Sequence, residues 1–176
     1  MLTVTTPEQV FGPLSPVEAL TAIAAIQKCL IDYCHGIDRC DADLVASVYH
    51  PDATDDHGSF VGLGTEFAFH ATKKLREYAI ATTHFCGLPS ITFETPTIAH
   101  VETQVLAWHR VKESVGPREF LEQFCGRYFD RFECRDGDWR IAHRSLTHDW
   151  DHKEFIDPAF ASGKFTPSPR SKSTTI

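Results

Sequence analysis

The 176-residue sequence has no run of basic residues, and its net charge is −7. A negatively charged protein without a Lys/Arg cluster lacks the usual footprint of nucleic-acid binding, so we expect no nucleic-acid partner. No stretch of eighteen apolar residues is present, so we expect no membrane-spanning helix. The segment MLTVTTPEQVFGPLSP has no basic region followed by an apolar one. We therefore expect no signal peptide and a cytoplasmic protein.

Several cofactor and metal motifs are also missing. The six cysteines include no C-x-x-C pair, which argues against a zinc ribbon or a thioredoxin-type site. There is no Gly-rich phosphate loop, no G-x-S-x-G and no H-E-x-x-H, so we expect no cofactor. DATDDH (52–57) and HDWDH (148–152) are rich in donors but match no zinc or calcium spacing, so we expect no functional metal. The cysteines are then expected to be reduced and mostly buried.

Phenylalanine, in contrast, is abundant: the chain has thirteen Phe beside four Tyr and three Trp. A chain of this length is expected to form one domain with a sizeable core and room for a cavity. The aromatic residues either fill that core or line an apolar pocket for a small apolar or aromatic molecule. The composition leaves both open.

The first half of the chain predicts helices. Ser15 and Glu18 flank Pro16 in the pattern of a capping box, and apolar residues follow at helical spacing up to Gly36, a typical C-terminal stop. The other expected elements are, in chain order, a short second helix capped by Asp41 or Asp43 and ending near residue 50, a strand over 53–63, a third helix over 65–81, and strands over 83–95, 97–113, 118–136 and 137–150.

This order, helices first and then an antiparallel meander, is typical of the α+β class with helices packed on one face of a curved sheet. Asp136-Gly137 marks a hairpin between the last two strands. We expect an N-terminal extension over residues 1–14, a domain over 15–156 and an irregular tail over 157–176.

Three segments resemble the SnoaL-like family of the NTF2-like superfamily: YCHGIDRCDADLVASVYHPDATDDHG (33–58), TTHF (82–85) and GRYFDRFECRDGDWRIAHR (126–144). The resemblance spans residues 16–150 and implies an NTF2-like cone, with three N-terminal helices on a strongly curved antiparallel or mixed sheet. It also implies a homodimer or homotrimer. Over residues 38–55 it is similar to the hexachlorocyclohexane dehydrochlorinases and scytalone dehydratases.

Those enzymes use an Asp–His pair, and their motifs match Asp38 and His84. Histidine is well suited to proton transfer near neutral pH, and a carboxylate on its second nitrogen fixes the tautomer and stabilises the imidazolium. Without the resemblance, other roles stay open: Asp38 as the cap of a turn and His84 as a core histidine bonded to the backbone.

The chain departs from the scytalone dehydratases at the groups that polarise the substrate. Ile37 stands where those enzymes have a tyrosine, and His57 replaces a second one. Gly126 and Tyr128 fall where they have a serine and an asparagine. The resemblance thus implies a retained Asp–His pair acting on a different substrate.

Strand alternation and the resemblance predict further pocket residues. Each of them could instead be a polar group that is satisfied in the core or at the surface. The substrate-binding candidates are Tyr33, Asp55, His57, His109, Tyr128 and, with Ser145 on the same face, His143.

We therefore expect a cofactor-independent lyase that acts on a small apolar, aromatic or alicyclic substrate. His84 would take a proton and the substrate would lose water, halide or a carbon fragment. Tyr33, Tyr128 or His143 would act as acid or hold an oxyanion. An isomerase or hydrolase on the same scaffold, or a non-catalytic ligand-binding or structural subunit, remains an alternative.

Overall fold

The computed structural model describes residues 11–114, 116 and 118–157. Its helices are α2 (Pro16–Arg39), α3 (Ala42–Ser47) and α4 (Gly64–Tyr78), and its strands are β1 (Tyr49–Asp56), β2 (Val61–Leu63), β3 (Ala79–Cys86), β4 (Ser90–Thr95), β5 (Ile98–Lys112), β6 (Glu119–Arg135) and β7 (Asp138–Ile156). No helix within the described ranges has the length and apolar character needed to cross a membrane.

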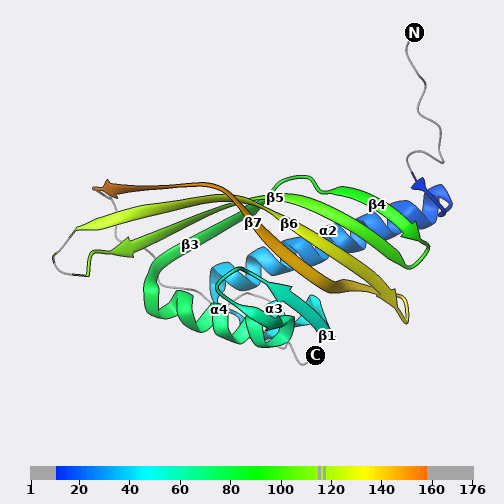
Figure 1. The fold of residues 1–176 in the computed structure, drawn as a ribbon, viewed down its shortest axis with the longest axis horizontal. Helices are drawn as coiled ribbons and strands as arrows, with labels where there is room; N and C mark the ends of the chain where they lie inside the picture. The colour runs from blue at the N-terminus through cyan, green and yellow to red at the C-terminus, as the bar shows by residue number, and fades with distance from the viewer. Residues whose placement is uncertain (1–10, 115, 117, 158–176) are drawn as a thin grey trace, which may run out of the picture.

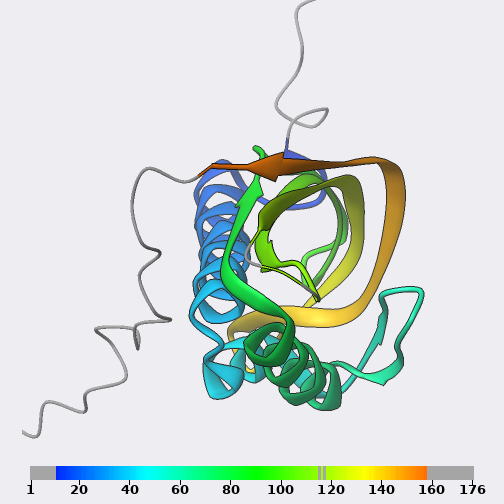
Figure 2. The ribbon, with the colours of Figure 1, turned by 90° about the vertical axis from the view of Figure 1, so that its left-hand side faces the viewer.

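The seven strands form one sheet in the order β2-β1-β7-β6-β5-β3, with β4 also paired to β5. β1 and β7 run parallel, and the other pairs are antiparallel. The long strands β5, β6 and β7 curl strongly without closing, as Figures 1 and 2 show. The expected α+β class with a large curved sheet is confirmed, and the mixed sheet agrees with the NTF2-like fold.

Helix α2 forms for the reasons visible in the sequence. Ser15 Oγ accepts from the Glu18 backbone N–H, and Glu18 returns a bond to the Ser15 backbone N–H, so the predicted capping box is present. The buried side chains recur every three or four residues, which gives α2 one apolar face: Ala19, Ala22, Ile26, Leu30, Tyr33 and Ile37. This face packs against the sheet beside β3 (Figure 2).

The predicted helix stop at Gly36 is wrong. α2 continues to Arg39, and Cys40 ends it in the left-handed conformation with φ 52°. Gly36 is instead a close-approach residue, because a Cβ there would lie 2.6 Å from Val45 Cγ2 of α3. Asp38 consequently lies in the last turn of the helix and not on a loop.

Strand β7 differs most from its prediction. It extends to Ile156 and carries two residues that have no partner on β6. The first is Ala142, because Arg131 pairs with His143 and the next residue, Phe132, pairs with Ile141. The second lies opposite the step from Cys125 to Gly126. Each such bulge inverts the alternation of side chains beyond it. The inward face of β7 therefore passes from Ile141 to Arg144.

Other boundaries shift less. The strand expected over 83–95 is two strands, separated at Gly87–Pro89. All six cysteines lie in the described part, where they are free thiols and three of them are buried. The division into an extension, a domain and a tail stays a prediction, because residues 1–10 and 158–176 lie outside the described residues.

We predict that Gly36→Ala destabilises the protein by about 1–3 kcal/mol, because the new methyl group meets Val45. Helix propensity alone predicts the opposite sign, a gain of up to about 1 kcal/mol. Urea unfolding measures the difference. Gly87→Ala is the control, since its Cβ meets nothing closer than 3.7 Å. A Gly36→Ala protein as stable as wild type would contradict the close-approach role.

Candidate active site

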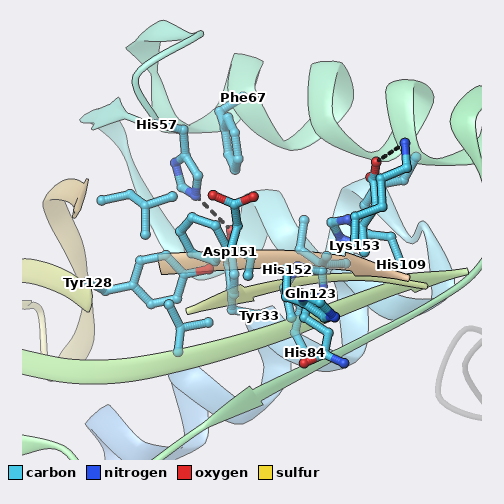
Figure 3. Close-up of a pocket in the computed structure, with 17 residues that line it drawn as sticks. Tyr33, His57, Phe67, His84, His109, Gln123, Tyr128, Asp151, His152 and Lys153 are labelled. Atoms are coloured by element: carbon cyan, nitrogen blue, oxygen red, sulfur yellow. Dashed lines mark hydrogen bonds and ion pairs between the residues drawn. The ribbon is translucent and has the colours of Figure 1, made fainter. Parts of the chain in front are cut away.

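A cavity of about 440 Å³ lies between α2, α4 and the inner face of the sheet (Figure 3). Seven apolar side chains line it, besides the tyrosine and histidine rings: Ile37, Phe67, Leu75, Val105, Ala107, Phe124 and Leu146. Its polar groups include Tyr33, His57, His84, His109 and Tyr128. Five of the predicted candidates thus line one cavity.

Asp38 and His84 form a hydrogen-bonded pair. His84 Nδ1 lies 2.8 Å from Asp38 Oδ1, and the His84 backbone N–H donates to both carboxylate oxygens at 2.8 and 3.0 Å. The last turn of α2 thereby holds β3 near its C-terminal end through one carboxylate. Because a carboxylate only accepts, Nδ1 carries the proton in neutral His84, and Nε2 keeps its lone pair.

The pair lies in the wall between two spaces. His84 lines the cavity, and its Nε2 has no hydrogen-bond partner in the described part of the chain. Asp38 lies behind it and lines an outer groove of about 480 Å³ between α2 and the β3–β4 connection. The side chains of His84 and Asp38 are 10% and 24% exposed. The arrangement can accept a proton from a molecule in the cavity while the carboxylate stays in contact with water.

His109 stands beside His84, with 5.5 Å between ring centroids. Its Nε2 is buried and has no hydrogen-bond partner among the described residues. Burial, and then the nearby His84, lower the pKa of His109 to about 4. His109 is therefore a neutral imidazole at physiological pH, and its Nε2 can donate to or accept from a ligand, according to the tautomer.

A second Asp–His pair lies at the other end of the cavity. His57 Nδ1 bonds Asp55 Oδ1, and Tyr49 donates to the other Asp55 oxygen at 2.7 Å. His57 Nε2 lies 3.3 Å from the Tyr33 hydroxyl, and the His57 ring stacks on Phe67 at 4.0 Å. Figure 3 shows His57 and Phe67 well apart from His84 and His109.

A buried ion pair supports this end. Arg144 donates to both Asp130 oxygens at 2.7 Å, and both side chains are fully buried. The guanidinium lies 3.9 Å from the ring centre of Tyr128 and 4.4 Å from that of Tyr33. Burial disfavours the charge of Arg144, but Asp130 outweighs it and holds the pKa of Arg144 well above its usual range.

Three of the predicted site residues do not line the cavity. Asp38 and Asp55 lie one layer behind it, each against its histidine. His143 is on the outer face of the sheet, where Nδ1 meets Thr54 Oγ1 at 2.7 Å, and Ser145 is there too. Their predicted inward orientation is wrong because the bulge after Ile141 exchanges the two faces of β7.

Sequence reasoning missed Arg144 altogether, and no pattern in the sequence signals the bulge that turns it inward. It also ended the last strand before three side chains at the cavity mouth, Asp151, His152 and Lys153. Phe124 and Asp130 lie on the same face of β6 as the predicted Tyr128, so alternation was sufficient there. Of the described residues, no group of three or more His, Cys, Asp or Glu is arranged to hold a metal ion.

We predict that Asp130→Asn costs about 3–5 kcal/mol of stability, because it leaves the Arg144 charge buried and unpaired. Replacing both partners, in Asp130→Leu with Arg144→Met, should recover most of the loss. Urea unfolding of the full chain gives both values. The control is Asp138→Asn, which breaks the exposed pair with Arg140 and should cost less than about 1 kcal/mol. Equal losses at Asp130 and Asp138 would count against the buried pair.

The lowered pKa of His109 predicts that the folded protein loses stability in acid. Its pKa in the folded state, about 4, lies below the ordinary 6.5, so the unfolded chain binds the proton first and stability falls from pH 6.5 to about 4. At about 1.4 kcal/mol per pKa unit, His109→Gln should lose up to about 3 kcal/mol less than wild type over this range. Urea unfolding at both pH values tests this, with the exposed His100→Gln as control. Parallel curves for His109→Gln and wild type would refute it.

Known structures share this architecture. A putative scytalone dehydratase from Novosphingobium aromaticivorans superposes with a TM-score of 0.69 at 22% identity, over 85% of this chain and all of that one. A hexachlorocyclohexane dehydrochlorinase (LinA) of type 2 gives 0.70 at 22% identity, over 88% and 99%. LinA-type3 from Novosphingobium barchaimii gives 0.69 at 21% identity, over 88% and 100%. At these identities the likeness shows the fold.

Comparison with proteins of curated function gives no match. The model of the SnoaL-like domain, in contrast, matches residues 18–145, most of the chain and nearly all of the elements that build the cavity. The resemblance inferred from the sequence is confirmed: the chain belongs to the SnoaL-like family, within the NTF2-like fold.

Proposed function

We propose that the protein is a cofactor-independent lyase in which His84, oriented by Asp38, is the general base. The observation that carries this is the geometry of the pair: Nδ1 on the carboxylate at 2.8 Å and Nε2 free on the wall of a mainly apolar cavity. Such a histidine can remove a proton from a bound molecule and share the resulting charge with Asp38. The family's dehydratase and dehydrochlorinase structures support a lyase-type scaffold.

The substrate we propose is a small apolar molecule, aromatic or alicyclic. Phe67, Phe124 and Leu146 present apolar surface, which excludes water and strengthens the electrostatics of the pair. Neutral His109 and the Tyr128 hydroxyl supply polar contacts for a carbonyl or hydroxyl group. Loss of water, of halide, or of a carbon fragment by retro-aldol cleavage are the candidate reactions.

An open cavity and a joined Asp–His pair favour an enzyme over a purely structural subunit, for which we would expect the cavity to be filled. The homodimer or homotrimer stays a prediction. Exposed apolar side chains on the outer side of α2 and β3 offer surface for such a contact: Val17, Leu20, Ile31 and Phe85.

The test uses two probes. The aldol adduct of benzaldehyde and acetone yields an enone if it is dehydrated and benzaldehyde if the carbon–carbon bond is cleaved, and a hexachlorocyclohexane reports loss of chloride. His84→Gln should slow the active reaction by about 10²–10⁴-fold. Asp38→Asn should cost at least about a hundredfold, because its amide donates to Nδ1 and so leaves the proton on Nε2.

His100→Gln, an exposed histidine on the outer face, is the control and should keep full activity. Turnover that survives in both His84→Gln and Asp38→Asn would sink the assignment of the base. Absence of turnover of either probe by the wild type would count against a lyase for small aromatic or alicyclic substrates.

A further inference from the structure

Two histidines line the cavity with an aspartate behind each, and one base accounts for only one of these pairs. In each pair the carboxylate takes Nδ1, so that Nε2 points away from it. The two differ in enclosure: Asp38 is in contact with an outer groove, whereas Asp55 is fully buried. The second pair also continues into the cavity through the Tyr33 hydroxyl.

Two buried carboxylates and one buried guanidinium lie near His57. Within the described residues, the charged side chains that are buried are Asp55, Asp130 and Arg144. They lie side by side on β1, β6 and β7, where Arg144 pairs in register with both aspartates. Arg144 gives its bidentate contact to Asp130. Asp55 accepts from Tyr49 and contacts His57, and protonated His57 would supply it with the countercharge that Arg144 supplies to Asp130.

Tyr33 is placed to carry a proton from His57. Burial raises the pKa of Tyr33 far above its usual range, so the side chain stays a phenol and keeps its proton. A hydroxyl can accept one hydrogen bond while it donates another. With His57 protonated, Nε2–H donates to the Tyr33 oxygen, which leaves the Tyr33 proton for a ligand in the cavity or for the neighbouring Tyr128.

We propose that His57, held by Asp55, is the general acid of this site and delivers a proton through Tyr33 to the leaving group. The proposal rests on the proposed lyase function with His84 as base. It also narrows the substrate to compounds that lose an oxygen, such as β-hydroxy ketones, because leaving hydroxide needs a proton whereas leaving chloride does not.

The proton transfers balance. His84 Nε2 takes a proton from the carbon next to the carbonyl, and the electrons of that C–H bond form the new C=C bond. The C–O bond breaks, and its oxygen takes the Tyr33 proton and leaves as water. Tyr33 takes the Nε2 proton of His57. After the enone and water depart, His84 has gained one proton and His57 has lost one, and exchange with solvent restores both.

The first experiment needs no substrate: ring nitrogen NMR of the full chain, with His57 assigned by its loss in His57→Gln. We expect both His57 nitrogens to carry protons at neutral pH and the signal to change in Asp55→Asn. The protonation state of His57 depends on the polar and charged groups that face it from the neighbouring elements. These are Tyr33 of α2, Tyr49 and Asp55 of β1, Tyr128 and Asp130 of β6, and Arg144 of β7, and α4 adds the apolar Phe67. A bare Nε2 at neutral pH would overturn the acid role.

The second experiment compares leaving groups on one skeleton, the benzaldehyde–acetone adduct and its chloride analogue. Asp55→Asn should slow loss of water about a hundredfold and change loss of chloride by less than about threefold. Asp56→Asn on the same strand is the matched control, because within the described residues that carboxylate bonds the exposed Gly58 N–H. Equal loss with both probes, or no loss with either, would overturn the proposal.

The same assay separates this proposal from the proposed function. His84→Gln should slow both probes, since both eliminations need the base. If His84→Gln slows both and Asp55→Asn does not discriminate between them, the acid role fails and the lyase stands. If His84→Gln slows neither, the lyase with this base fails, and the acid role fails with it.

Discussion

The buried contact between Arg144 and Asp130 is the interaction on which the geometry of the cavity depends. It joins β7 to β6, and the guanidinium also lies against the rings of Tyr33 and Tyr128. In a low-dielectric interior, paired charges are strongly attracted and unpaired ones are costly, so the arrangement has little freedom to shift. Tyr33 belongs to α2, so the ion pair fixes where this helix, and Asp38 at its end, meet the sheet.

The two ends of the cavity then have different relations to water. At one end, the Asp38 carboxylate that bonds His84 is partly exposed and lines the outer groove. At the other, Asp55 is enclosed by Tyr49, His57 and neighbouring strands. The carboxylate of one pair stays in contact with bulk water while a ligand occupies the cavity, and the carboxylate of the other pair is enclosed. This asymmetry is a physical basis for assigning them opposite roles.

Local signals in the sequence were sufficient for the elements and for one face of most strands. The capping box at Ser15 and the alternation that turns Tyr128 inward follow from side-chain chemistry and periodicity. The pairing of Asp38 with His84 needed the family resemblance, since 46 residues separate them. Gly36 misled because a glycine required by close packing has the same sequence signal as a helix stop. His143 and Arg144 exchanged places because a bulge depends on how two strands meet, which neither strand encodes alone.

Because Ala142 is an extra residue in β7, a deletion or insertion beside it would change which side chains of the strand face inward. The bulge places Arg144 inward and His143 and Ser145 outward. Loss of a single codon on the Ile141 side of Arg144 would remove the bulge and present the opposite set of side chains to the ligand, while the other strands keep their sequences. Short insertions and deletions in this strand are thus a direct route by which one scaffold can acquire different chemistries.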